Sequence, residues 1–185
     1  MTQRIRPINP TEAQGQAKSL LDAVAAQLGG VPNIIKTFAQ SPAVLQGYLG
    51  FSDALSKGTL DARLREQIAL AVAGSNGCDY CASAHSFLAK KTGVDSDEVI
   101  RNLKGEASDA RTDAALQFAK ALVAKRARVT DDELEAVRSA GFSGEEVVEI
   151  IGNVALNLFT NYFNHVADTE IDFPVVNTGT VAPAA

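Results

Sequence analysis

The sequence predicts an all-α protein, a single-domain bundle of about seven to nine helices. Alanine and leucine dominate the chain, and the apolar–polar alternation typical of half-buried strands is absent except in short patches. Several segments instead carry apolar side chains at helical spacing and are bounded by residues that start or stop helices. With 185 residues, one domain is long enough to bury its own core.

Helix boundaries follow from local signals. Pro42 favours a first helical turn, Asn76-Gly77 is a helix stop followed by a turn, and capping boxes begin at Asp95, Thr130 and Ser143. The segment beginning at Asp61 becomes apolar on all sides, which indicates deep burial. The expected helices span Thr11–Leu28, Pro42–Lys57, Asp61–Gly74, Cys78–Lys91, Asp97–Leu103, Ala110–Arg126, Asp131–Ala140 and Gly144–Val166.

The C-terminal end lacks helical periodicity. Residues 172–185 contain two prolines and a glycine, so we expect a helical domain over 1–174 and an irregular tail over 175–185. The tail is expected either to dock on a neighbouring subunit or to be disordered.

The charge and hydropathy of the chain indicate which classes of partner it is not expected to bind. The net charge is −5 and the basic residues are scattered, so neither nucleic acid nor a membrane is an expected partner. No apolar run approaches membrane-spanning length, and the start Met-Thr-Gln-Arg-Ile-Arg-Pro lacks a signal core. We therefore expect a cytoplasmic protein, in whose reducing compartment a Cys-x-x-Cys pair favours catalysis or metal binding over a structural disulfide.

The candidate site is a constellation around the two cysteines. Cys78 and Cys81 are the protein's only cysteines, His85 follows one helical turn after Cys81, and Glu66 precedes the pair on the previous helix. Thiols at this spacing can form a disulfide or share a metal ion. The helix start favours the thiolate form, and His85 lies on the same face as Cys81, where it can exchange a proton with the sulfur. Glu66 completes a proton relay.

These residues supply what two-electron reduction of a peroxide needs: a nucleophile, a resolving thiol, a base and a relay acid. Two other readings remain open. The cysteines can be core filler, because free cysteine is often buried. Alternatively, Cys78, Cys81, His85 and either Glu66 or His165 can bind zinc, although no second close ligand pair is present.

A polar stripe marks the last helix. Asn153, Asn157, Asn161 and His165 recur every fourth residue in an otherwise apolar segment. The favoured interpretation is a set of interhelical amide bonds, because buried amides must be hydrogen-bonded. The functional alternative is that Asn161 and His165 line the thiol pocket.

The spacing of Glu66, Cys78, Cys81 and His85 resembles the E-x11-C-x-x-C-x3-H signature of the alkylhydroperoxidase D core, within the carboxymuconolactone decarboxylase-like superfamily. The ending Asn161-Tyr-Phe-Asn-His-Val-Ala-Asp-Thr-Glu-Ile-Asp-Phe-Pro174 is similar to that of its uncharacterised peroxidase-related branch. The resemblance implies a helical bundle of that type, assembled as a homo-oligomer, commonly a trimer or hexamer. It also implies that Cys81 attacks peroxide and Cys78 resolves, with Glu66 and His85 in the relay.

One position departs from the best-studied type of this family, in which a histidine stands between the cysteines. Here Tyr80 occupies that place, and a phenol cannot replace imidazole as a base at neutral pH, so the expected relay is shorter. Tyr80 is therefore expected to hydrogen-bond or to shape the pocket.

The sequence thus predicts a thiol-dependent peroxidase, with a non-enzymatic redox-sensing or zinc-binding helical oligomer as the alternative. No resident metal or organic cofactor is expected, since no glycine-rich phosphate loop follows a strand. Electrons must then come from a partner dithiol, such as a lipoyl domain or a thioredoxin-like protein.

Overall fold

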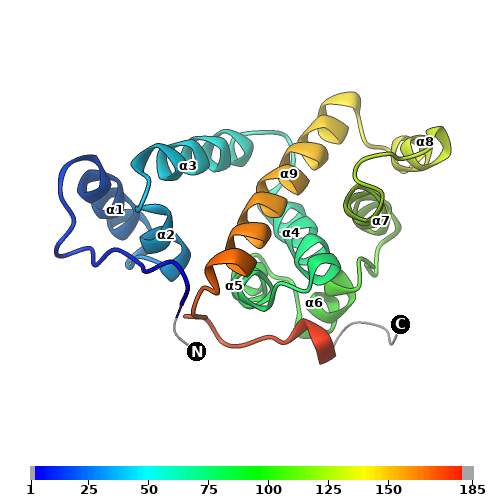
Figure 1. Ribbon diagram of the computed structural model, residues 1–185. Coiled ribbons are helices and arrows are strands. Elements are labelled where there is room, and N and C mark those ends of the chain that lie inside the picture. The colour runs from blue at the N-terminus through cyan, green and yellow to red at the C-terminus, as the bar shows by residue number, and fades with distance from the viewer. Residues whose placement is uncertain (1–2, 181–185) are drawn as a thin grey trace.

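The computed structural model describes residues 3–180, which contain nine α-helices, one short 3₁₀-helix and no strand (Figure 1). The predicted all-α class is confirmed. The helices are α1 (Gly15–Leu28), α2 (Asn33–Phe38), α3 (Pro42–Ser56), α4 (Ala62–Asn76), α5 (Asp79–Lys91), α6 (Ser96–Leu103), α7 (Ala110–Ala124), α8 (Asp131–Ser139) and α9 (Gly144–Ala167), followed by the 3₁₀-helix Thr178–Thr180.

Helix α4 is the centre of the bundle. It packs against α5, α6, α7 and α9, and its residues 67–73 are all buried, as the all-round apolar pattern predicted. One hydrophobic cluster on its flank includes Leu70 and Ala73 and reaches α1, α2 and α5. A second cluster contains Ile68 and Val72 and joins α7, α8 and α9. The side chains of α4 therefore connect the two halves of the core.

The capping signals place most helix starts correctly. Thr130 and Ser143 both form complete capping boxes with the glutamate three residues later, and Asp95 accepts a hydrogen bond from the Glu98 N–H. The first helix begins later than predicted, at Gly15 rather than Thr11. Gly15 has a φ of +56°, so a regular right-handed helix does not continue backwards through it.

Helix α2 was missed by the sequence analysis. It is only six residues long, and two of its first N–H groups find partners far along the chain. The Asn33 N–H donates to Asp172 at 2.8 Å, and the Ile34 N–H donates to the Tyr80 hydroxyl at 3.2 Å. Because the orphan donors at a helix start need acceptors, this helix depends on tertiary contacts that no local pattern reveals.

The C-terminal segment packs on the helical domain. Residues 172–180 lie against α5 of the same chain (Figure 1). The Val176 N–H donates to Ser83 at 2.9 Å, and the Thr178 N–H donates to Asp79 at 2.8 Å. The remaining part of the predicted tail, 181–185, lies outside the described residues.

The helices α4 and α6 approach closely at Gly74. A Cβ atom added there would overlap the backbone carbonyl of Leu103, the last residue of α6, so only glycine permits this packing. Gly50, in the middle of α3, is exposed and has open space where a Cβ would be placed.

We predict that Gly74→Ala destabilises the protein by about 1–3 kcal/mol or more, because backbone rather than a flexible side chain must move. Gly50→Ala is the matched control and should be neutral or stabilising by up to about 1 kcal/mol, since alanine favours a helix interior. Urea unfolding followed by circular dichroism measures both. Equal stability of the two variants would contradict the close approach of α4 and α6.

Candidate active site

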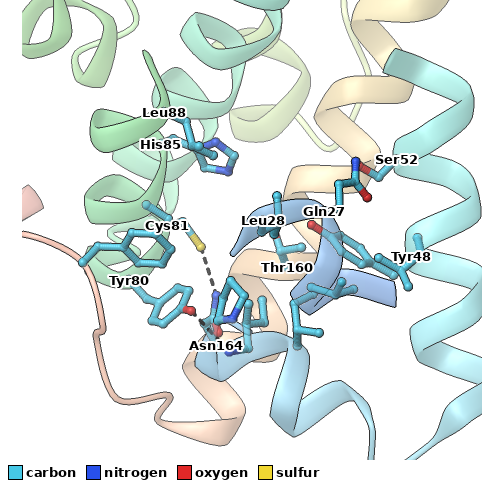
Figure 2. Close-up of a pocket in the computed structure, with 17 residues that line it drawn as sticks. Gln27, Leu28, Tyr48, Ser52, Tyr80, Cys81, His85, Leu88, Thr160 and Asn164 are labelled. Carbon is cyan, nitrogen blue, oxygen red and sulfur yellow. Dashed lines mark hydrogen bonds between the residues drawn. The ribbon is translucent and has the colours of Figure 1, made fainter. Parts of the chain in front are cut away.

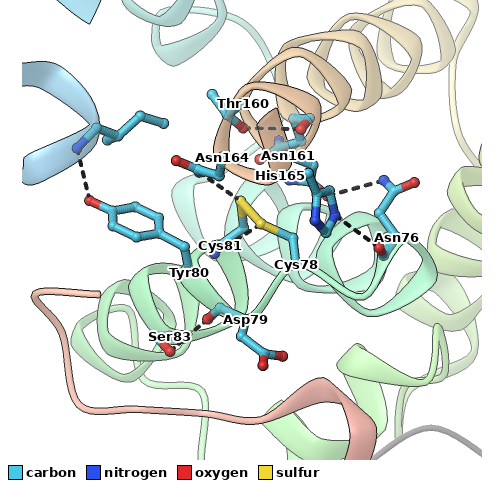
Figure 3. The surroundings of a disulfide bond; sticks show 12 residues. Asn76, Cys78, Asp79, Tyr80, Cys81, Ser83, Thr160, Asn161, Asn164 and His165 are labelled. Carbon is cyan, nitrogen blue, oxygen red and sulfur yellow. Dashed lines mark hydrogen bonds between the residues drawn. A yellow bond between two sulfur atoms is a disulfide. The ribbon is translucent and has the colours of Figure 1, made fainter. Parts of the chain in front are cut away.

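The turn between α4 and α5 presents the two cysteines. Gly77 ends α4 in the left-handed region, with a φ of +65°, and the Cys78 N–H donates back to Ala73 at 3.0 Å. Cys78 is then the N-cap of α5, and its sulfur accepts the Cys81 N–H at 3.3 Å. The Cα atoms of Cys78 and Cys81 are 5.3 Å apart and their side chains form a disulfide (Figure 3). The Asn76-Gly77 stop signal is confirmed.

Both sulfurs are covered. Cys78 is 2% exposed and Cys81 is 3% exposed, so the start of α5 at Cys78 is no more exposed than the turn at Cys81. Helix α9 packs across the start of α5, and the amide nitrogen of Asn164 lies 3.2 Å from the Cys81 sulfur. The two cysteines differ instead in the cavity that each one lines.

Glu66 and His85 are brought together from α4 and α5. The Glu66 Oε2 atom lies 2.7 Å from His85 Nδ1, and both side chains are about one-fifth exposed, at 21% and 23%. With the proton on Nδ1 donated to the carboxylate, the lone pair of the neutral imidazole is on Nε2. The carboxylate therefore fixes the imidazole tautomer and stabilises the ring if it becomes charged.

Cys81 and His85 line one cavity of about 230 Å³ between α1, α2, α3, α5 and α9 (Figure 2). Its walls are mainly apolar: Val24, Leu28, Ile34, Ile35, Leu49, Leu88 and Phe173. Polar groups include His85, Asn164 and the hydroxyls of Tyr48 and Ser52. An apolar chamber with a few polar groups beside a sulfur is the usual form of a small-molecule site.

A second cavity, also of about 230 Å³, adjoins the first and is more polar. It shares Tyr48, Ser52 and His85 with the apolar cavity and adds Glu66 and Arg65. Burial, followed by the negative charge of Glu66, raises the pKa of Tyr48 to about 12. Tyr48 is therefore a neutral hydrogen-bond donor between the cavities at neutral pH.

Tyr80 does not face the sulfur as a base. Its hydroxyl donates to Asp172 at 2.9 Å and accepts the Ile34 N–H, which ties α5 to α2 and to the C-terminal segment. Burial is the main cause that raises the pKa of Tyr80 well above its usual value, and Asp172 adds to the effect. Tyr80 therefore forms hydrogen bonds and also lines the cavity, so both expected roles are present.

The polar stripe of α9 divides between two kinds of contact. Asn161 accepts a hydrogen bond from the Asn76 amide at 3.0 Å, which is the expected interhelical amide bond. Asn153 and Asn157 instead donate to carbonyls one turn earlier on α9 itself, contrary to that expectation. His165 is exposed, and its Nε2 atom lies 3.1 Å from the Asn76 carbonyl oxygen.

Asn164 was missed by the sequence analysis, although its amide contacts Cys81. The buried Oδ1 atom of Asn164 has no hydrogen-bond partner within the described residues, and the residue lines the apolar cavity. Following the stripe by strict four-residue steps led to His165. A step of 11 residues from Asn153 returns to within about 20° of the same helix face and leads to Asn164 instead.

Residues 42–124 match the family model described as the carboxymuconolactone decarboxylase family. This span contains Glu66, Cys78, Cys81 and His85. The fold resembles a solved structure described as an alkylhydroperoxidase AhpD core, an uncharacterized peroxidase-related protein from Ralstonia eutropha JMP134. That likeness has a TM-score of 0.80 and 25% identity over 92% of each chain. In sequence over residues 42–124, and in fold over most of its length, the chain is similar to the alkylhydroperoxidase D-like, carboxymuconolactone decarboxylase-like superfamily.

Two further proteins are similar to this chain, one in fold and one in a short stretch of sequence. The debrominase Bmp8, solved in complex with 2,3,4-tribromopyrrole, has a TM-score of 0.78 at 23% identity over 93% of each chain, which shows a shared fold. An uncharacterized protein of Haemophilus influenzae is 48% identical over 48 residues. That match spans 25% of this chain and 42% of the relative's length.

Two properties of residues 3–180 concern membranes and metal ions. None of the helices there is both long enough and apolar enough to cross a membrane. Nor do three or more histidine, cysteine or acidic side chains in this part of the chain gather as a metal site would require. The zinc ligand set considered from the sequence is therefore not assembled in the disulfide form.

We predict that Tyr80→Phe leaves the Cys78–Cys81 disulfide intact but loosens the cavity wall. Losing the hydroxyl leaves the buried Ile34 N–H without its acceptor, which should cost about 1–3 kcal/mol. Hydrogen exchange measured by NMR should show faster exchange of the Ile34 amide. Unchanged protection of that amide would contradict the bridging role of Tyr80.

Proposed function

We propose that the protein is a thiol-dependent peroxidase in which Cys81 attacks the peroxide, Cys78 resolves, and Glu66 with His85 relays the proton. The observation that carries the proposal is the position of the Cys81 side chain. Already bonded to Cys78, it lines the same apolar cavity as His85, whose imidazole is held by Glu66. The match of residues 42–124 to the carboxymuconolactone decarboxylase family and the likeness in fold to a peroxidase-related protein support the same class of chemistry.

Two features of the fold favour a reactive thiolate at Cys81. The residue lies in the first turn of α5, where the unpaired N–H groups and the helix dipole stabilise negative charge. The Asn164 amide donates to its sulfur, and a hydrogen bond to a charged form favours that form. Neither feature requires a metal ion.

The proposed oxidation balances in two steps. The Cys81 thiolate attacks one peroxide oxygen, the O–O bond breaks, and the departing alkoxide or hydroxide takes the proton held by His85. The Cys78 thiol then attacks the resulting sulfenic acid, which releases water and forms the disulfide. Two thiols and one peroxide thus give a disulfide, an alcohol or water, and a second water.

A dithiol partner would return the two electrons by thiol–disulfide exchange. A lipoyl domain and a thioredoxin-like protein both carry suitable chemistry. The peroxide is the substrate and the dithiol is the reductant in this proposal, with no resident cofactor.

We predict that Cys81→Ser abolishes the first peroxide turnover. Cys78→Ser should still consume one equivalent and stop at a sulfenic acid that dimedone traps, as mass spectrometry would show. Wild-type protein treated with mild peroxide should yield a peptide that links the two cysteines. If Cys78→Ser were instead the variant unable to use the first equivalent, the assigned roles would be reversed.

The same peroxide assay tests the proposed proton relay of Glu66 and His85. His85→Asn and Glu66→Gln should each slow the first turnover by about 10²-fold or more, because each removes acid–base assistance. Stoichiometric zinc together with unreactive thiols in the reduced protein would favour the zinc-binding alternative. Reactive, metal-free thiols that form the disulfide without significant turnover would favour the redox-sensing alternative.

The exposed face of α9 supports a homo-oligomer, such as a trimer or hexamer. Large apolar side chains follow one another along this helix at 41–67% exposure: Val148, Ile151, Phe159, Tyr162 and Val166. A continuous apolar stripe of this kind is uncommon on a monomer and is typical of an interface.

We predict a solution mass that is a multiple of 19.5 kDa. Val166→Glu should shift light scattering towards the monomer, because it places a charge on the stripe. Val175→Glu, at an exposed apolar residue outside α9, is the matched control and should keep the assembly intact. A wild-type mass of 19.5 kDa at micromolar concentration would rule the oligomer out.

A further inference from the structure

The two sulfurs of the disulfide line different cavities. Cys81 lines the apolar cavity with His85, whereas Cys78 lines a separate cavity of about 280 Å³ with His165, Asp79 and Asp168. Figure 3 shows the His165 ring beside Cys78, between the disulfide and Asn76. The cavity at Cys78 is more polar than the apolar cavity at Cys81, and its exposed rim includes His165.

We infer that this polar cavity is where the reductant's thiol enters, and that His165 accepts the proton of that thiol as it attacks Cys78. The inference rests on the proposed redox cycle and adds the side from which electrons arrive. It gives each sulfur its own imidazole: His85 serves Cys81 during oxidation, and His165 serves Cys78 during reduction.

The hydrogen bond of His165 determines which ring nitrogen can act as the base. Its Nε2 atom lies 3.1 Å from the Asn76 carbonyl oxygen, which can only accept, so Nε2 carries the proton. The neutral ring then has its lone pair on Nδ1. Asn76 is the last residue of α4, and its amide also donates to Asn161, so the helix end that leads into Cys78 positions the imidazole as well.

The nearby carboxylates are poorer candidates for this role. Asp79 is engaged by the Thr178 N–H at 2.8 Å and by the Thr178 hydroxyl at 2.5 Å. A carboxylate is also a much weaker base than imidazole towards a thiol. The apolar cavity offers no equivalent route, because the sulfur that lines it is Cys81, and a thiol entering there would not reach Cys78.

The exchange balances as follows. One thiol of the reductant transfers its proton to His165 and bonds to the Cys78 sulfur, while the Cys78–Cys81 bond breaks and Cys81 leaves as a thiolate that accepts the Asn164 amide hydrogen bond. The second thiol of the reductant then releases its proton to solvent and attacks the mixed disulfide. Cys78 leaves and takes the proton held by His165, and the reductant departs as its own disulfide, oxidised by two electrons.

The test separates the two half-reactions in full-length protein. Oxidised wild type, His165→Asn and His165→Gln are mixed with dihydrolipoamide in a stopped-flow instrument, and the rate of disulfide reduction is measured. Both variants should slow reduction by about 10²-fold, the usual loss when a general base is removed. With pre-reduced protein, both should keep the first peroxide turnover within about twofold.

Two controls distinguish a proton acceptor from a structural residue. 5-Thio-2-nitrobenzoate is already a thiolate at neutral pH, so its attack on the disulfide should be unaffected by His165→Asn. His85→Asn should show the opposite pattern to His165→Asn, with slow peroxide turnover and reduction within about threefold of wild type.

The inference is overturned if His165→Asn and His165→Gln reduce at the wild-type rate, or if they slow the preformed thiolate as much as dihydrolipoamide. Because the readout is reduction of an existing disulfide, it does not depend on peroxide being the substrate. Loss of the His165 effect leaves the peroxidase proposal intact. Absence of peroxide turnover with the His165 effect present removes only that proposal.

Discussion

The burial of residues 67–73 of α4 on every side is the constraint on which the rest of the structure depends. Because this helix packs against α5, α6, α7 and α9 at once, it cannot rotate without disturbing both hydrophobic clusters. Its N-terminal half holds Glu66 against His85 of α5, and its C-terminal end holds Asn76 against α9. The same rigid element thus positions a partner for each imidazole, one on either side of the cysteine pair.

The short turn between α4 and α5 places the two cysteines beside the end of this rigid helix. Gly77 reverses the chain within the left-handed region, so that α5 begins beside the end of α4 and Cys78 becomes its N-cap. The sulfurs therefore lie at a positive helix end and beneath α9, where few water molecules compete with the Asn164 amide. Low exposure and favourable electrostatics act together at this point, and the cavities on either side provide the access that the covered sulfurs need.

The segment after α9 completes the site from the far end of the chain. Asp172 receives both the Asn33 N–H of α2 and the Tyr80 hydroxyl of α5, and Phe173 lines the apolar cavity and contacts the Tyr80 ring edge-on. One carboxylate thus joins three segments that are distant in sequence. The cavity that would hold a substrate exists only because these segments meet, which explains why an irregular C-terminal stretch has a fixed path over the bundle.

The sequence by itself determined the helical class, most of the helix boundaries and the candidate constellation, because periodicity, caps and close spacings are local properties. Glu66, Cys78, Cys81 and His85 could be singled out since three of them lie within two turns of one helix and the fourth lies on its neighbour. Only the tertiary structure decided what depends on distant contacts. These features are the formation of α2, the burial of both cysteines, the path of the C-terminal segment, and the choice of Asn164 rather than Asn161 as the amide that contacts sulfur. The physical reason is that acceptors for the α2 N–H groups, and the direction in which each face of α9 points, are set by packing between elements far apart in the chain.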